Sequence, residues 1–139
     1  MPLAAFPSAV LAAAVLAVQE VSFLLVGSAA LWLRGEMADI ADADAVIEPG
    51  RSNIDCLRAA LDGIAIGPVP SVDNFCCRSV VPVVTAYGKV DCLLERGRLD
   101  WGRLRRGAGF LPVADVPVLV AASADAWDLR RRYRKRENE

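Results

Sequence analysis

The chain has 139 residues, enough for one domain, and it combines a net charge of −1 with 55% hydrophobic residues. It contains no histidine, which excludes histidine-based catalytic triads and zinc sites that use histidine. The small net charge hides an asymmetry, because residues 1–50 hold one basic and six acidic side chains, whereas residues 95–139 hold eleven basic and seven acidic ones.

The first feature along the chain is an apolar segment, residues 3–33, whose strongly polar residues are Gln19 and Glu20. A membrane-spanning helix needs about 20 mostly apolar residues, and this segment is longer. Apolar residues would cover every face of a helix over residues 9–33, which is typical of a membrane span or of the centre of a larger core. We therefore expect a single-pass membrane protein, with residues 1–35 as the hydrophobic helix and residues 36–139 as a small extramembrane region. A cleaved signal peptide and a soluble core helix are the alternatives.

Two residues of this segment are candidates for contact with a partner helix. Glu20 would be costly near the bilayer centre unless a polar group or a proton neutralised it. Gly27 would allow a second helix to approach closely. Both features predict other membrane subunits as partners.

The residues that follow predict short helices separated by loops. Residues 36–48 have near-heptad apolar spacing among acidic residues, which favours an amphipathic helix with a solvated acidic face that ends at Pro49. The spacing of these acids does not match a calcium-binding loop. Residues 53–61 predict another helix. Residues 79–85 are β-branched, but Pro82 restricts any strand there to a sheet edge, and residues 89–94 favour a short helical turn.

The four cysteines support two interpretations. They could form disulfides, with three connectivities open, or they could be buried apolar residues. A four-thiolate zinc site lacks the paired C-x-x-C spacing that it requires. The cysteines are Cys56, Cys76, Cys77 and Cys92.

Arginines dominate two segments near the end of the chain. Residues 96–106 place five arginines around Trp101, and a predicted final helix from Val116 to about Arg134 ends in a basic cluster. Guanidinium groups suit anionic lipid headgroups or, less well given the overall charge, nucleic acid. The candidate residues for contact with an anionic partner are Arg103, Arg105, Arg106, Arg131, Arg132 and Arg134.

Together these patterns predict a mainly α fold and a non-enzymatic, membrane-associated accessory or structural subunit. Two alternatives are a secreted or virion-type disulfide-containing interaction protein and a soluble helical module that binds nucleic acid. No residue pattern predicts a catalytic site, a cofactor or a metal. An enzyme is the weakest class, because no motif supports a role for Asp91, Cys92 or Glu95.

Overall fold

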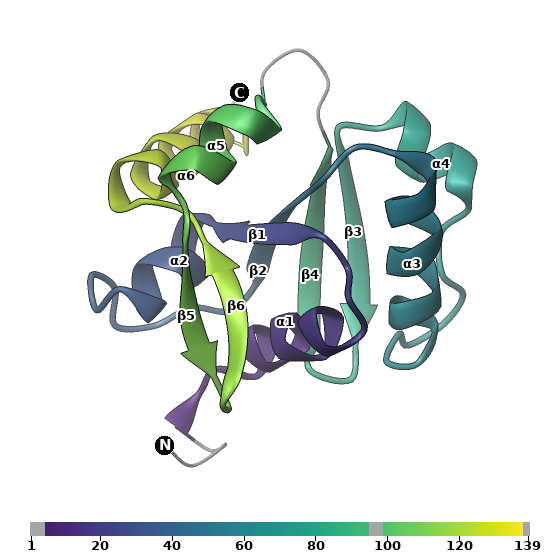
Figure 1. Ribbon diagram of the computed structural model, residues 1–139, viewed down its shortest axis with the longest axis horizontal. Coiled ribbons are helices and arrows are strands. Elements are labelled where there is room, and N and C mark those ends of the chain that lie inside the picture. Colours follow the sequence, from purple (N-terminus) through teal and green to yellow (C-terminus); the bar gives the residue numbers. More distant parts are fainter. Residues whose placement is uncertain (1–4, 95–98, 138–139) are drawn as a thin grey trace.

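The computed structural model describes residues 5–94 and 99–137 and shows an α/β fold built on one six-stranded mixed sheet (Figure 1). The strand order is β3-β4-β2-β1-β6-β5. β1 is antiparallel to β2 and parallel to β6, β2 is parallel to β4, and β3 and β5 are antiparallel edge strands. In chain order the elements are α1 (Ser8–Val18), β1 (Phe23–Val26), α2 (Gly27–Leu33), β2 (Ala43–Ile47), α3 (Arg51–Asp62), α4 (Val72–Cys77), β3 (Val80–Thr85), β4 (Gly88–Leu94), α5 (Trp101–Gly107), β5 (Gly109–Val113), β6 (Val116–Val120) and α6 (Ser123–Glu137).

The described part of the apolar segment is not one helix but α1, β1 and α2 in succession. α1 ends in a Schellman turn, in which the amide of Val21 donates to the carbonyl of Leu16 and the amide of Glu20 donates to that of Ala17. Glu20 has φ 65° there, a left-handed conformation that a continuing α-helix does not contain. Within residues 5–94 and 99–137 no helix has both the length and the apolar character needed to cross a membrane. The predictions of a transmembrane helix and of a single-pass membrane location are therefore wrong.

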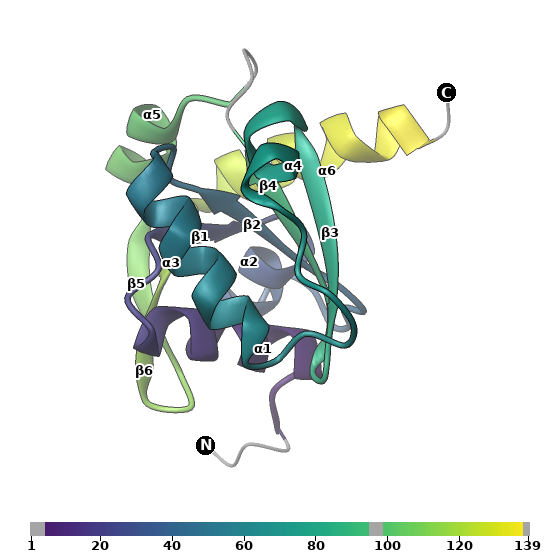
Figure 2. The ribbon, with the colours of Figure 1, turned by 90° about the vertical axis from the view of Figure 1, so that its right-hand side faces the viewer.

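Most of the apolar residues of this segment are buried by the rest of the chain. All four residues of β1 are buried, because strands pair with it on both sides and helices cover both faces of the sheet. α1 and α3 lie on one side of the sheet, and α2 and α6 lie on the other (Figure 2). A continuous apolar run is what a central strand covered on both faces requires, so it does not indicate lipid.

Strands replace several predicted helices, which makes the prediction of a mainly α fold wrong. β2 occupies the acidic segment that was expected to be helical, and β4 occupies residues 88–94. β6 takes residues 116–120, so the final helix begins only at Ser123. The helix expected at residues 53–61 is confirmed as α3, and Pro82 lies in an edge strand as its missing amide proton demands.

Polar contacts attach α2 to the end of β6 and to α6. Nε of Arg34 donates to the carbonyl oxygen of Ala121 at 2.7 Å, and its Nη2 donates to that of Val120 at 3.1 Å. Glu36 accepts a hydrogen bond from the hydroxyl of Ser123 and another, at 3.4 Å, from the indole of Trp127. These contacts hold α6 beside α2 on one face of the sheet.

Candidate active site

Two carboxylates lie side by side on neighbouring parallel strands. Asp44 of β2 and Asp91 of β4 are register partners, so their side chains project from the same face of the sheet. The two carboxyl groups share a hydrogen bond. We call Asp44 and Asp91 the carboxylate pair.

The junction between β1 and α2 creates the space for this pair. Val26 is the register partner of Asp44, and the chain turns directly after it into α2 through Gly27, which has φ 57°. A Cβ atom at Gly27 would lie only 2.8 Å from Oδ2 of Asp44. A glycine therefore meets two demands at once, the left-handed backbone and the close approach of a carboxylate.

Burial and mutual repulsion make the carboxylate pair hard to ionise completely. The pKa of Asp44 is raised to about 7, first by burial and then by the charge of Asp91 and the hydrogen bond with it. Burial also raises the pKa of Asp91, and the positive charge of Lys89 opposes that rise. Two such carboxylates near neutral pH share a proton unless additional positive charge is supplied.

Lys89 supplies part of that charge from the same face. It precedes Asp91 by two residues on β4, and its Nζ lies 3.7 Å from Oδ1 of Asp91 and 3.7 Å from Oδ2 of Asp42. Asp42 is much more accessible than Asp91, with side chains 46% and 18% exposed, respectively. The face thus carries an acidic centre with a partly exposed ammonium group beside it.

The donor set suits Mg²⁺ that is bound together with a phosphorylated substrate. Mg²⁺ is usually held by one or two carboxylates, and water and substrate phosphates complete its octahedron. Asp44 and Asp91 offer oxygen donors of this kind, and the missing Cβ of Gly27 leaves room beside them. In the part of the chain that the structure describes, no group of three or more His, Cys, Asp or Glu residues is arranged to hold a metal ion. Water and the phosphates of a substrate would supply the remaining ligands.

The residues predicted to contact a partner helix have other positions. Glu20 forms the turn after α1, where its left-handed backbone ends the helix. Gly27 borders Asp44 and does not face a second membrane helix. Gly27 is therefore part of the candidate site, although the sequence-based reason for selecting it does not apply.

The cysteines and arginines lie outside the carboxylate pair. Cys92 is buried on β4 with its pKa raised to about 12, mainly by burial, so it is a poor nucleophile. Cys56 and Cys77 are free thiols, half-buried and exposed respectively, and Cys76 is exposed on α4. Glu95 falls outside the described residues.

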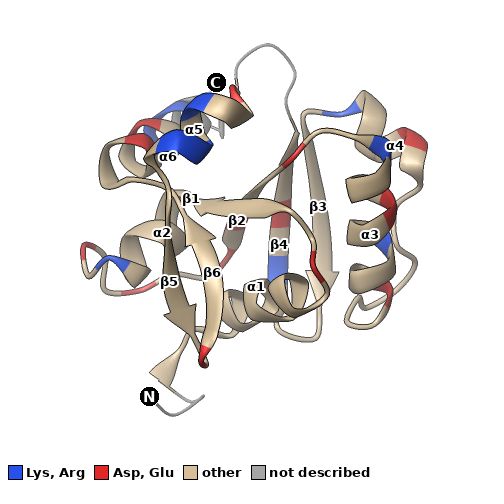
Figure 3. Ribbon diagram, in the orientation of Figure 1, with Lys and Arg blue, Asp and Glu red and all other residues tan. Residues whose placement is uncertain are grey.

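The structure places the first arginine segment beside the start of α6. Nη2 of Arg103 on α5 lies 3.1 Å from Oδ1 of Asp125 on α6, and Arg105 lies over the ring of Phe110. Figure 2 shows that α6 extends away from α5 toward its C-terminal end. Both helices carry exposed arginines (Figure 3). They are Arg103, Arg105 and Arg106 on α5 and Arg131 and Arg132 on α6; the side chain of Arg134 is outside the described part. Their contact with an anionic partner stays a prediction.

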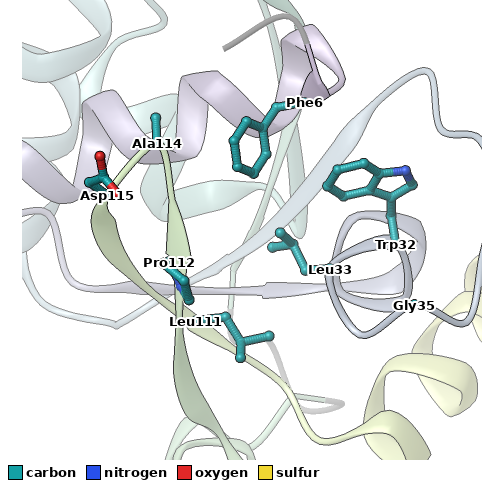
Figure 4. A pocket seen from close by; sticks show the side chains of 8 residues that line it. All are labelled: Phe6, Trp32, Leu33, Gly35, Leu111, Pro112, Ala114 and Asp115. Atoms are coloured by element: carbon teal, nitrogen blue, oxygen red, sulfur yellow. The ribbon is translucent and has the colours of Figure 1, made fainter. Parts of the chain in front are cut away.

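An apolar pocket of about 400 Å³ lies at another place, between the start of the chain, α2 and the β5–β6 hairpin. Phe6 and Trp32 lie next to each other in its lining, with their rings tilted and the ring centroids 5.9 Å apart (Figure 4). Asp115 is the charged residue of its lining. The pocket offers apolar contact rather than reactive groups.

The sequence analysis did not predict the carboxylate pair, because it assigned helical periodicity to the segment around Asp44, which forms a strand. On a helix, Asp42 and Asp44 would point in different directions, whereas on a strand both lie on one face. Two signals were present: the Asp-x-Asp spacing before buried apolar residues, and a Gly-Ser step directly after the four-residue apolar run of β1. Nothing in the local sequence indicates that Asp91 lies beside them.

Comparison with known proteins gives a fold but no family. No protein-family model matches the chain, and no curated protein matches it. Among solved structures, it is similar to a protein from Thermotoga maritima described as a "putative nucleotidyltransferase", with a TM-score of 0.61 and 14% sequence identity. The alignment covers 86% of this chain and 78% of that one.

This likeness corrects the functional predictions. The chain shares the fold of a protein described as a "putative nucleotidyltransferase", which contradicts the prediction of a non-enzymatic protein. The described residues contain no helix able to span a membrane, which contradicts the prediction of a membrane accessory subunit. The same α/β fold contradicts the alternative of a helical nucleic-acid-binding module. Because the identity is only 14%, the likeness establishes the fold alone.

Proposed function

We propose that this chain is a nucleotidyltransferase that moves a nucleoside monophosphate from a nucleoside triphosphate to an acceptor hydroxyl group and releases pyrophosphate. The observation that carries the proposal is the carboxylate pair, which lies in register on parallel strands beside the glycine that opens α2. The fold likeness to a protein described as a nucleotidyltransferase supports the same reaction class.

Asp44 and Asp91 would hold a divalent cation such as Mg²⁺ through their carboxylate oxygens. When bound, the cation would neutralise charge on the phosphates and on the transferred group. The two carboxylates then lose the shared proton that burial and repulsion favour. The closeness of the two carboxylates destabilises the protein when no cation is bound, and the same closeness favours binding of a cation.

Lys89 and Asp42 would act around this centre. Lys89 opposes the rise that burial causes in the pKa of Asp91, and its ammonium group can reach a phosphate oxygen from the same face. Asp42 holds Lys89 from the exposed side through an ion pair at 3.7 Å. With the cation bound, both carboxylates are ionised, and Asp91, the one beside Lys89, is placed to accept the proton of the attacking hydroxyl group.

Transfer of label from α-³²P nucleoside triphosphates tests the proposal. The purified chain is incubated with Mg²⁺ and a mixture of cellular RNA and protein as acceptors. We expect labelled acceptor with the wild type, and none with Asp44→Asn, with Asp91→Asn or in EDTA. Labelling that survives either substitution would show that another group performs the reaction.

A further inference from the structure

The face that carries the carboxylate pair continues, toward the edge of the sheet, as an exposed apolar surface. In the antiparallel pairing of β3 with β4, Val84 is the partner of Lys89 and Pro82 is the partner of Asp91. Partners in register project from the same face, so both residues of β3 share the face of the carboxylates. β3 and β4 lie side by side at the right of the sheet in Figure 1.

A third apolar residue extends this surface past β3. Ala65 and Thr85 form an isolated antiparallel bridge, and the amide of Ile66 donates to the carbonyl of Val84 at 2.9 Å. Ile66 is thus opposite Val84, and it projects from the same face. We call Ile66, Pro82 and Val84 the apolar strip.

The apolar strip is accessible, in contrast to the other face of the same strand. Ile66 is 66% exposed and Val84 is 53% exposed, whereas the alternate residues Val81, Val83 and Thr85 are at most 4% exposed. α2 and α6 cover the β1 part of this face, and they leave the β3 part open. Large exposed aliphatic residues that are contiguous with charged groups are typical of a binding surface.

We propose that the apolar strip binds the base of a nucleoside phosphate whose phosphates lie at Lys89 and the carboxylate pair. The order of groups across the strands supports this ligand: carboxylate on β2, carboxylate and ammonium on β4, then apolar side chains on β3 and at residue 66. With strands ~4.8 Å apart, the strip begins roughly 10 Å from Asp44, which suits a ligand that is charged at one end and flat and apolar at the other.

The chemistry of the apolar strip also limits its selectivity. None of its three side chains carries a hydrogen-bonding group, so they can contact the flat face of a base but cannot distinguish its polar edges. We expect adenosine, guanosine, cytidine and uridine triphosphates to bind with affinities within about threefold of one another, which is well under 1 kcal/mol. This inference rests on the proposed function, because it places the phosphates at the carboxylate pair.

Calorimetry with two probes in Mg²⁺ tests the inference separately from the proposed function. Inorganic tripolyphosphate measures the phosphate site alone, and a non-hydrolysable nucleoside triphosphate analogue adds the ribose and the base. We expect the analogue to bind about tenfold more tightly than tripolyphosphate to the wild type. We expect the double variant Ile66→Ser, Val84→Thr to lose that advantage while it keeps its affinity for tripolyphosphate.

A matched control and two contrary outcomes complete the test. Val18→Thr changes an apolar residue of α1 that is 60% exposed, and it should leave both affinities unchanged. Equal binding of the two probes by the wild type would overturn the role of the apolar strip while leaving the proposed function intact. A strip that serves instead as an interface between two copies would give a dimer that the double variant dissociates, with nucleotide affinity unaffected, and this result would also overturn the inference. If neither probe binds, the proposed function fails as well.

Discussion

The carboxylate of Asp44 occupies the position that a side chain at residue 27 would need. A Cβ atom on Gly27 would be 2.8 Å from Oδ2 of Asp44, closer than non-bonded carbon and oxygen atoms approach. This contact links the β1–α2 junction to the carboxylate pair. Gly27 therefore affects both the stability of the junction and the position of a carboxylate of the candidate site.

Replacing Gly27 by alanine should therefore destabilise the protein and displace the carboxylate of Asp44. We expect Gly27→Ala to lower the free energy of unfolding by about 2 kcal/mol or more, because φ 57° strains an L residue and Asp44 must move. Urea denaturation measures the loss. Gly63→Ala is the control, because Gly63 has φ −74° and a Cβ there would be 3.6 Å from the nearest atom. An equal loss in both variants would argue against the close approach of Asp44.

The carboxylate pair should make stability depend on pH in an unusual direction. The pKa of Asp44 rises from 3.8 to about 7 on folding, so its contribution is most favourable below pH 3.8 and is lost as the pH rises toward 7. Asp44→Asn removes this penalty. We expect it to raise the free energy of unfolding at pH 8 by about 1–3 kcal/mol, with the gain disappearing toward pH 4.

Denaturation curves of the wild type and of Asp44→Asn across this pH range provide the measurement. Asp55→Asn, at an exposed position of α3, is the control for a general effect of removing a carboxylate. A gain that stays constant from pH 4 to pH 8 would mean that Asp44 does not titrate as described.

How far the fold can be predicted from the sequence depends on whether each segment shows the spacing of apolar residues that is typical of a helix or of a strand. Helix α3 has a clear apolar stripe, and its prediction is confirmed. β1 is buried on both faces, so it shows no alternation, and the apolar residues of α1 and α2 on either side of it produced the appearance of one long helix. Local pattern cannot separate a buried strand from a buried helix, because both are simply apolar.

The candidate site could be predicted only in part. The spacing of Asp42 and Asp44 is a local signal, and it would have been recognised if β2 had been assigned as a strand. Asp91 is distant in sequence and reaches Asp44 only through the parallel pairing of β4 with β2. Such pairing is decided by the packing of the whole sheet, so no inspection of residues 88–94 could reveal it.

The break between α1 and β1 gives a prediction about Glu20. A glycine at this C′ position avoids the cost of a left-handed L residue. We expect Glu20→Gly to raise the free energy of unfolding by about 0.5–1 kcal/mol, measured by thermal and urea denaturation. Gln19→Gly, at a residue with φ −82°, should instead lower it by a similar amount. Destabilisation by Glu20→Gly would indicate that α1 does not end there.

Arg34 is predicted to hold α2 against the end of β6. Arg34→Met keeps the length of the side chain but loses both hydrogen bonds to the carbonyl groups of Val120 and Ala121. We expect the free energy of unfolding to fall by about 1–3 kcal/mol. We also expect the substitution to accelerate hydrogen exchange more in α6 than in the other elements. Arg131→Met, at an exposed position of α6, should change neither quantity. An equal acceleration of exchange in α6 and in the strands of the sheet would contradict this attachment.

The central claim is that Asp44 and Asp91 form one site for a divalent cation and a nucleotide. The most direct measurement is calorimetric titration of a non-hydrolysable nucleoside triphosphate analogue into the wild type, Asp44→Asn and Asp91→Asn, with Mg²⁺ and with EDTA. We predict Mg²⁺-dependent binding by the wild type, weakened by at least about tenfold in each variant, while both variants remain folded by circular dichroism. Binding that is equally tight in EDTA, or that both variants retain, would contradict the claim.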